Sequence, residues 1–225
     1  MVAALFPAAG IGKRMGAAMN KVLIPISGTP ILVHTLRKFS ACDKVDFLIV
    51  ITGKNEMEEV AGILSKESLK PYKIVAGGKE RQYSVENGLD ALPENAEILL
   101  VHDAARPLVS VKTIESVIEA ARKNGAAIAA LPEKNTVKVV ENGIIKDTPN
   151  REKLFAALTP QGFKRDILIN AYKKAREDGF LGTDDASLVE RTGTSVHIVL
   201  DEDTNIKLTT PNDLKLAKIF LGSDG

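Results

Sequence analysis

The N-terminal segment constrains this chain most, because an apolar run passes directly into a loop of small residues. Residues 2–6 read Val-Ala-Ala-Leu-Phe and predict a strand, and residues 7–16 read Pro-Ala-Ala-Gly-Ile-Gly-Lys-Arg-Met-Gly. Small side chains let main-chain N–H groups face a polyphosphate closely. Lys13, Arg14 and Lys21 supply positive charge that can neutralise such an anion. The segment therefore predicts a strand that leads into an anion-binding loop.

Two common nucleotide-binding motifs do not fit this loop. The dinucleotide fingerprint G-x-G-x-x-G requires a glycine where Met15 stands, and the Walker motif requires a glycine at Pro7 and Ser or Thr at Arg14. The remaining pattern, Ala-Ala-Gly-x-Gly-x-Arg-Met followed by a lysine, resembles the signature of the sugar-phosphate nucleotidyltransferases. That resemblance implies an enzyme that joins a nucleoside triphosphate to a phosphorylated small molecule and releases pyrophosphate. The alternative is a glycine-rich turn whose cations are only solvated.

The rest of the chain alternates between buried strands and helices. Near-continuous β-branched and apolar runs are typical of strands buried on both faces, as in a parallel sheet. Strands are expected at residues 2–6, 47–51, 72–75, 98–101, 126–131 and 196–199, and helices at 31–39, 56–64, 84–92, 113–123, 166–177 and 213–220, with a further helix beginning near 183–187. No linker or repeat divides the chain. The pattern predicts one α/β domain over 1–225 with a mostly parallel sheet. The resemblance to the nucleotidyltransferases implies that this domain has their Rossmann-like three-layer fold.

A β-hairpin interrupts this alternation. Two strand-like runs flank Asn142-Gly143, and Asn-Gly between such runs is a strong hairpin signal. A two-stranded hairpin is marginally stable alone in water, so it must lie on its own domain or on a second subunit. We favour the second subunit and predict that residues 135–151 form a protruding β-arm for dimerisation.

The composition limits which binding partners and which cellular compartment are expected. The chain has 225 residues and a formal net charge of +1, which favours neither nucleic acid nor an anionic membrane as a partner. The apolar run at residues 2–6 is too short to span a membrane and lacks a basic leader. The single cysteine, Cys42, cannot form an internal disulfide. A cytoplasmic location is expected.

The segment after the strand at 98–101 is the second candidate site. It reads His-Asp-Ala-Ala-Arg-Pro over residues 102–107, and ligands in open α/β sheets bind beyond the carboxyl ends of strands. This segment should therefore meet the first loop in space. We interpret His102 as a hydrogen-bonded structural histidine. Asp184 and Asp185 are adjacent on a helix and do not face together, so a helix-capping role is favoured over a metal pair.

Six segments in order carry a more specific resemblance. They are residues 7–15, Gly77-Gly78 followed by Arg81 and Ser84, residues 102–107, residues 158–161, Thr183-Asp184 and residues 205–207. Together they resemble the 2-C-methyl-D-erythritol 4-phosphate cytidylyltransferase family, from residue 2 to about residue 221. The resemblance implies cytidylyl transfer from CTP to 2-C-methyl-D-erythritol 4-phosphate, with pyrophosphate released, in non-mevalonate isoprenoid synthesis. It also implies Mg²⁺ as the cofactor and a homodimer.

The resemblance also assigns site residues by position. Catalytic roles fall to Arg14, Lys21, Arg151 and Lys207. Nucleotide binding falls to Pro7, Ala8, Ala9, Gly10, Gly12, Gly78, Ser84, Asp103 and Ala104. Substrate binding falls to Asp103, Arg106, Thr136, Arg151, Thr159, Thr183 and Lys207. In the family, Thr136, Arg151 and Thr159 serve the neighbouring subunit's site. No metal-ligand set is expected, because magnesium is held mainly through the CTP phosphates.

Two positions depart from the family pattern, and two other functions remain open. Asn20 stands where proline is usual, which should alter loop stiffness, and Lys79 stands where many relatives carry an acid. A ribitol 5-phosphate cytidylyltransferase would share the CTP-binding half of the chain. A non-catalytic nucleotide-binding regulatory subunit is the alternative from another class. A nicotinamide oxidoreductase is disfavoured by the missing third glycine.

Overall fold

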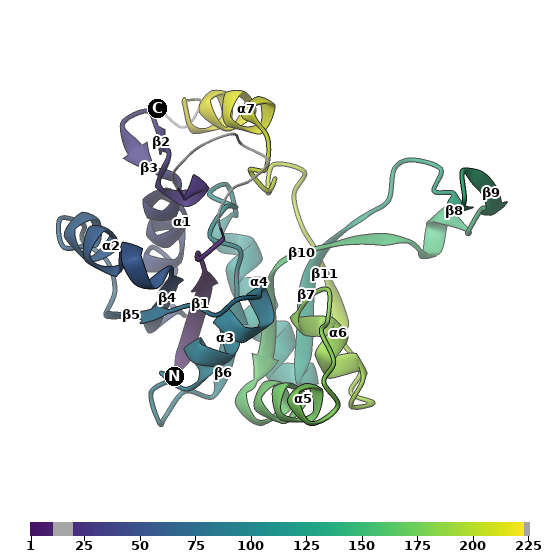
Figure 1. Ribbon diagram of the computed structural model, residues 1–225, viewed down its shortest axis with the longest axis horizontal. Coiled ribbons are helices and arrows are strands. Elements are labelled where there is room, and N and C mark those ends of the chain that lie inside the picture. Colours follow the sequence, from purple (N-terminus) through teal and green to yellow (C-terminus); the bar gives the residue numbers. More distant parts are fainter. Residues whose placement is uncertain (11–19, 223–225) are drawn as a thin grey trace.

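A seven-stranded sheet forms the centre of the protein, whose computed structural model describes residues 1–10 and 20–222 (Figure 1). Its strands are β1 (Val2–Pro7), β4 (Phe47–Thr52), β5 (Tyr72–Ala76), β6 (Ile98–Val101), β7 (Ala126–Pro132), β10 (Phe155–Lys164) and β11 (His197–Leu200). Their order in the sheet is β11-β7-β10-β6-β1-β4-β5. Strand β10 runs antiparallel to both of its neighbours, and the other pairings are parallel. The predicted mostly parallel α/β sheet is confirmed.

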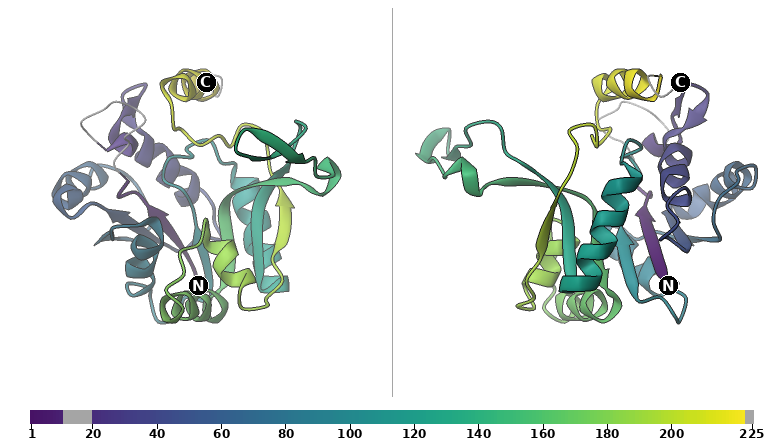
Figure 2. Two further views of the ribbon diagram at one scale, coloured as in Figure 1. Left: turned by 45° about the vertical axis from the view of Figure 1, so that its right-hand side comes forward. Right: turned by 180° about the vertical axis from the view of Figure 1, so that it is seen from behind.

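Helices cover both faces of this sheet (Figures 1 and 2). They are α1 (Ile31–Ser40), α2 (Met57–Leu64), α3 (Arg81–Leu89), α4 (Val111–Asn124), α5 (Arg165–Glu177) and α6 (Asp185–Glu190), whereas α7 (Pro211–Gly222) lies above the sheet (Figure 1). Short 3₁₀ turns are η2 (Lys21–Leu23), η3 (Lys54–Glu56) and η4 (Arg151–Lys153). Alternate residues of β1 point to opposite faces. Ala4 and Phe6 join the core beneath α1, α2 and α4, whereas Ala3 and Leu5 join the core beneath α3, α5 and α6. Two buried layers thus explain why the strand sequences are apolar throughout.

Strand β10 is the main element that the sequence does not predict. Residues 154–158 and Thr159-Pro160-Gln161 are not assigned to a strand from the sequence, since proline is disfavoured within a sheet. The structure accommodates Pro160 where the register of β10 against β7 shifts, between Ala157 and Gln161. Beyond the shift the strand inserts between β6 and β7 and fills the centre of the sheet.

The predicted arm is present and stands away from the body (Figures 1 and 2). Strands β8 (Val139–Glu141) and β9 (Ile144–Asp147) pair antiparallel. Asn142 and Gly143 have φ angles of 51° and 77°, as a two-residue hairpin turn requires. Every residue of both strands is exposed. The hairpin therefore does not lie on its own domain; its role in dimerisation stays a prediction.

A small apolar cluster, which includes residues of the C-terminal helix α7, lies above the sheet. A two-stranded ribbon of β2 (Pro25–Ile26) and β3 (Thr29–Pro30) packs with α7, and their core contains Ile26, Leu208 and Ala217. The N–H of Leu208 donates to the carbonyl of Ala105, 2.9 Å away. This bond ties the residues before α7 to the loop that follows β6. None of the helices in the described part of the chain is long and apolar enough to cross a membrane.

Candidate functional site

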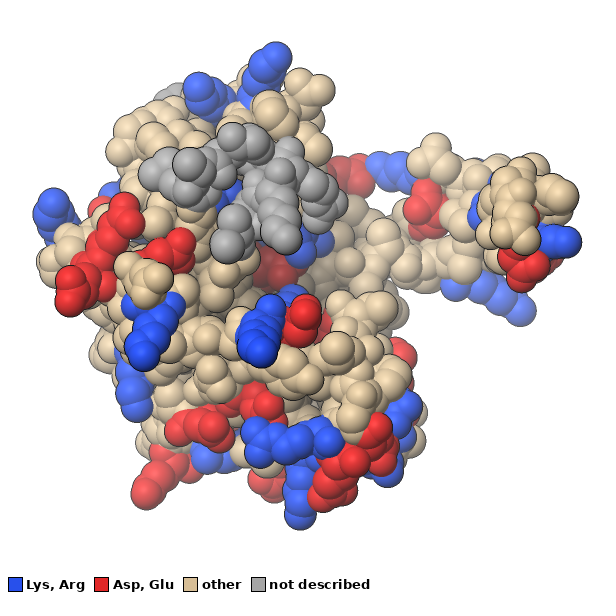
Figure 3. All heavy atoms as spheres, viewed as in Figure 1, with Lys and Arg blue, Asp and Glu red and all other residues tan. Residues whose placement is uncertain are grey.

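A cavity of about 200 Å³ opens beyond the carboxyl ends of β1 and β6. The chain runs from β1 to β4 and β5 on one side and then crosses to β6 on the other, so the cavity lies where the strand order reverses, the usual ligand site of such sheets. It is lined by Pro7, Ala8, Ala9, Gly10, Lys21, Val22, Gly78, Lys79, Glu80, Arg81, Ser84, Asp103, Ala104, Ala105 and Lys207. Figure 3 shows the surface hollowed near the middle of this face, with acidic atoms deep inside and basic atoms beside them.

Main-chain hydrogen bonds fix the two strand ends that form the floor. The N–H of Ala8 donates to the carbonyl of Ile51 at 2.7 Å, which extends the β1 to β4 pairing by one residue. The N–H of His102 donates to the carbonyl of Leu5 at 2.9 Å and does the same between β6 and β1. The loops after both strands therefore leave the sheet from fixed points.

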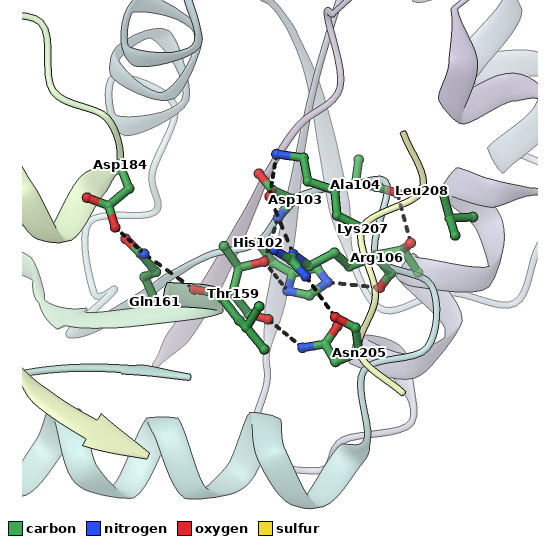
Figure 4. A network of polar contacts seen from close by, with 12 residues as sticks. His102, Asp103, Ala104, Arg106, Thr159, Gln161, Asp184, Asn205, Lys207 and Leu208 are labelled. Carbon is green, nitrogen blue, oxygen red and sulfur yellow. Dashed lines mark hydrogen bonds and ion pairs between the residues drawn. The ribbon is translucent and has the colours of Figure 1, made fainter. Parts of the chain in front are cut away.

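Asp103 lies at the centre of a cluster of positive charges (Figure 4). Its carboxylate is 2.8 Å from Lys207 Nζ, and 3.5 Å from the Nε atoms of Arg81 and Arg106. Burial alone would raise the pKa of Asp103, but the charges of Lys207, Arg81 and Arg106 outweigh it and hold that pKa well below its usual value. Asp103 is consequently ionised at neutral pH, holds Lys207 and Arg81 at the cavity and pairs with Arg106 behind it.

His102 is buried behind Asp103, and both of its ring nitrogens are hydrogen-bonded. Nε2 donates to the carbonyl of Arg106 at 3.1 Å, and Nδ1 accepts from the hydroxyl of Thr159 at 3.0 Å. The same hydroxyl accepts from the N–H of Asp103 at 3.1 Å. Burial lowers the pKa of His102 to about 3, so the ring is neutral at physiological pH. The interpretation of His102 as a hydrogen-bonded structural histidine is confirmed.

A second ionic contact supports Arg81 from the far side. Its guanidinium donates to Asp185 Oδ2 at 2.7 Å, and Tyr172 donates to the other oxygen of Asp185 at 2.5 Å. Asp185 is fully buried, whereas Asp184 caps α6 by accepting from the N–H of Ser187. The predicted helix cap is therefore confirmed for Asp184. The role of Asp185 was missed, because its partner lies more than a hundred residues away in the sequence.

Two glycines allow close packing of the turn that follows β5, beside the cavity. A Cβ atom on Gly77 would lie 2.6 Å from Ala9 Cβ and 2.9 Å from Ser84 Oγ. A Cβ atom on Gly78 would lie 2.5 Å from Tyr83 Cβ. The N–H of Gly78 donates to Ser84 Oγ at 3.0 Å, which holds the turn against α3. The two glycines therefore allow this turn to pack directly against Ala9 and α3 beside the cavity.

The structure brings most of the expected site residues together. Those that line the cavity are Pro7, Ala8, Ala9, Gly10, Lys21, Gly78, Ser84, Asp103, Ala104 and Lys207. Gly12 and Arg14 lie outside the described residues. Sequence reasoning gave no site role to Arg81, although its place after the glycine pair and before Ser84 was a usable signal.

Five expected substrate-binding residues lie elsewhere in the described part of the chain. Arg106 is buried behind the cavity, where it donates to the carbonyl of Asn205 at 2.7 Å, and Thr159 lies beneath Asp103. Thr136 and Arg151 are exposed near the two ends of the arm segment 135–151, and Arg151 donates to the carbonyl of Lys134 at 3.0 Å. Thr183 is exposed before α6. One chain alone thus does not gather the whole predicted acceptor site.

No group of three or more His, Cys, Asp or Glu side chains that could hold a metal ion is found among residues 1–10 and 20–222. Asp103 is the buried carboxylate of the cavity, and it already contacts cations. The donor set therefore suits a divalent cation only if a bound phosphate and water supply most of its ligands.

A cationic cavity beyond the carboxyl ends of parallel strands, walled by small residues, defines a nucleotide-binding enzyme of the nucleotidyltransferase class. The chain belongs to the 2-C-methyl-D-erythritol 4-phosphate cytidylyltransferase (IspD) family, whose model matches residues 2–223.

Named relatives and solved structures agree with this family. The chain is 46% identical to the 2-C-methyl-D-erythritol 4-phosphate cytidylyltransferase of Geotalea uraniireducens, over 99% of this chain and 97% of that protein. It superposes on 4-diphosphocytidyl-2C-methyl-D-erythritol synthase from Anaerococcus prevotii with a TM-score of 0.88 at 32% identity, covering 98% and 96% of the two chains. For 2-C-methyl-D-erythritol 4-phosphate cytidylyltransferase from Thermus thermophilus the TM-score is 0.80 at 32% identity, covering 96% and 97%.

Proposed function

We propose that this protein transfers a cytidylyl group from CTP to 2-C-methyl-D-erythritol 4-phosphate, giving 4-diphosphocytidyl-2-C-methyl-D-erythritol and pyrophosphate, a step of non-mevalonate isoprenoid synthesis. The observation that carries the proposal is the convergence of Lys21, Lys207 and Asp103 on one cavity in a chain of this family. Gly78 and Ser84, which line the cavity, are the proposed contacts of the cytosine base.

The reaction needs charge neutralisation more than proton transfer. The acceptor is a phosphate monoester whose oxygen is already anionic near neutral pH, so it attacks the α-phosphorus of CTP without a general base. His102 is neutral, buried and hydrogen-bonded at both nitrogens, and the mechanism assigns it no proton transfer. The difficulty is that two anions must approach while negative charge grows on the α-phosphoryl oxygens and on the leaving pyrophosphate.

Four cations divide this task between the two substrates. Arg14 and Lys21 stabilise the triphosphate and the charge that develops at the α-phosphorus, and the position of Lys21 on the cavity wall supports its share of that role. Lys207 and Arg151 position the acceptor phosphate for attack. The side chain of Lys207 is 40% exposed even while it contacts Asp103, so a phosphate can reach its ammonium group.

Mg²⁺ is proposed as the cofactor. Asp103, a buried carboxylate that lines the cavity, is placed to contribute to the binding of this ion. The CTP phosphates would supply the remaining negative charge. When bound, the ion withdraws electron density from the phosphoryl oxygens and makes pyrophosphate a better leaving group.

A cytoplasmic homodimer is the proposed form of the enzyme. Arg151 and Thr136 lie in the arm segment and do not line the cavity of their own chain, which supports their use in a partner's site. The exposed apolar side chains of Val139, Val140 and Ile145 on the arm support its burial against a second copy.

The deciding experiment measures pyrophosphate release from CTP with each candidate acceptor. The purified protein with MgCl₂ should turn over 2-C-methyl-D-erythritol 4-phosphate at least about a hundredfold more efficiently than ribitol 5-phosphate. A preference for ribitol 5-phosphate would change the substrate assignment. Tight CTP binding without turnover on either acceptor would point to the non-catalytic regulatory subunit instead.

A further inference from the structure

The residue that directly precedes Lys21 is a buried amide with unusually many hydrogen bonds. Asn20 is 4% exposed. Its Nδ2 donates to the carbonyl of Ala8 at 2.5 Å and to Glu56 Oε2 at 2.9 Å. Its Oδ1 accepts from the N–H of Val22 at 3.3 Å. One side chain thus connects three parts of the fold: the end of β1, the β4 to α2 connection, and the turn η2.

The oxygen of Glu56 that accepts from Asn20 is also held by two other hydrogen bonds. Glu56 Oε2 also accepts from Thr52 Oγ1 at 3.0 Å and from the N–H of Gly53 at 3.2 Å. Thr52 is fully buried at the end of β4. A Cβ atom on Gly53 would lie 2.9 Å from this oxygen, so the close approach depends on glycine. The carboxylate is therefore fixed to the sheet and offers Asn20 a rigid partner.

Both neighbours that Asn20 restrains lie on the cavity wall. Ala8 donates its N–H to Ile51 and accepts from Asn20 through its carbonyl, so both of its main-chain polar groups are fixed. Lys21 begins η2, in which the main-chain carbonyl of Asn20 accepts from the N–H of Leu23 at 3.0 Å. Ala8 and Lys21 both line the cavity.

The backbone of Asn20 explains what the side chain adds. Its φ of −61° and ψ of 124° lie in the range that proline also adopts. Ring closure would restrain φ at this position, but it would supply no bond to Ala8 or Glu56. The amide therefore links the residue to the sheet, which restraint of a single dihedral angle does not do.

We propose that Asn20 and Glu56 form a clasp that positions Lys21 and Ala8 for the nucleotide, so that Asn20 is a positioning residue for cytidylyl transfer. The clasp acts through Lys21 and makes no contact with substrate. This inference rests on the proposed function. Since a displacement of about 1 Å in a positioned group can cost about a hundredfold in rate, a loosened clasp should affect turnover more than folding.

The experiment compares Asn20→Asp, Glu56→Gln and the double variant with wild type. Asn20→Asp keeps the size and the acceptor for Val22 but places a carboxylate oxygen against Ala8 and Glu56. We expect kcat to fall about tenfold to a hundredfold and the Kd for CTP, measured by calorimetry, to rise, while the KM for the polyol phosphate changes less than about threefold. In the double variant, the introduced glutamine amide can donate to the introduced aspartate carboxylate, so part of the lost kcat should return.

Glu59→Ala is the matched control, because Glu59 is an exposed carboxylate in the first turn of α2, three residues after Glu56, and its loss should leave all three quantities unchanged. If Asn20→Asp does not fold, Glu56→Ala at its partly exposed position serves as the second variant, with the same expected kcat loss. An Asn20→Asp enzyme with wild-type kcat and CTP affinity overturns the clasp. The clasp is also overturned if the Kd for CTP and the KM for the polyol phosphate rise equally and the lost kcat does not return in the double variant. A wild-type protein that fails to bind CTP would instead overturn the proposed function.

Discussion

At the scale of single residues, the site is an arrangement of charges that compensate one another. Asp103 keeps Lys207, Arg81 and Arg106 close together through direct ion pairs, and Asp185 balances Arg81 from behind. The cations are therefore gathered before a nucleotide arrives, so less reorganisation is needed when phosphates bind.

Lys21→Ala should retain the fold and lose most activity. Lys21 lines the cavity, and removal of one preorganised donor at a developing negative charge typically costs about a hundred- to a thousandfold in kcat. Circular dichroism should match wild type while pyrophosphate release falls by that factor. Near-normal turnover would remove Lys21 from the mechanism.

Asp103→Asn should change stability in a pH-dependent way. The pKa of Asp103 is held below its usual value in the folded protein, so the unfolded chain binds more protons at acid pH. The stability that the ionised group contributes is present above its ordinary pKa of about 3.9 and is lost as pH falls through the lower folded pKa. At pH 7 the variant should be less stable by about 1 to 3 kcal/mol. Urea titrations should show this difference shrinking below about pH 4; a constant difference from pH 7 to pH 2 would contradict it.

At the scale of elements, β10 is where sequence and structure disagree most. Apolar runs predicted the parallel strands, and Asn-Gly predicted the arm, because each follows from local periodicity or turn geometry. Strand β10 could not be predicted from local sequence patterns. Its first residues are exposed although they pair with the end of β7, its proline lies at the register shift, and its inner half is buried by neighbours distant in sequence.

The candidate site likewise contains some residues that the sequence predicts and others that it does not. The anion-binding loop after β1 and the segment after β6 that contains Asp103 were predicted because each directly follows a strand in a short motif, whereas the roles of Gly78, Arg151 and Lys207 came from the family resemblance. The pairing of Arg81 with Asp185 and the clasp of Asn20 with Glu56 could not be predicted from the sequence, since each joins segments that only the folded sheet brings together.

A pair of glycine-to-alanine variants tests how tightly β10 is packed. A Cβ atom on Gly162 would lie 2.8 Å from Val117 Cγ1 of α4, so Gly162→Ala should destabilise the protein by about 1 to 3 kcal/mol. Gly62 lies exposed in α2 with open space around it, so Gly62→Ala should stabilise the protein by up to about 1 kcal/mol. Thermal or chemical unfolding measures both. Equal effects of the two substitutions would contradict the packing of β10 against α4.

At the scale of the whole molecule, the arm is the feature that a single chain leaves unexplained. Val140 and Ile145 are paired across the hairpin and are 53% and 58% exposed. Directly paired residues share one face of a hairpin, so these two form an apolar surface that a partner could cover.

The double variant Val140→Asp, Ile145→Asp should therefore be monomeric. Charges on this face would be desolvated in a dimer, which should weaken association by more than about a hundredfold. Sedimentation velocity should show a dimer for wild type and a monomer for the variant, with unchanged circular dichroism. Lys146→Ala, an exposed change on the same strand, is the control. A dimeric double variant would contradict the proposed role of the arm.

Strand β10 begins four residues after the arm ends, and it carries Thr159, whose hydroxyl accepts a hydrogen bond from the N–H of Asp103. Assembly and ligand capture would therefore share one continuous piece of backbone. By thermodynamic reciprocity, a ligand that binds the assembled form more tightly than the single chain should strengthen subunit association by the same factor, and dilution below the dissociation constant of the dimer should weaken ligand affinity correspondingly.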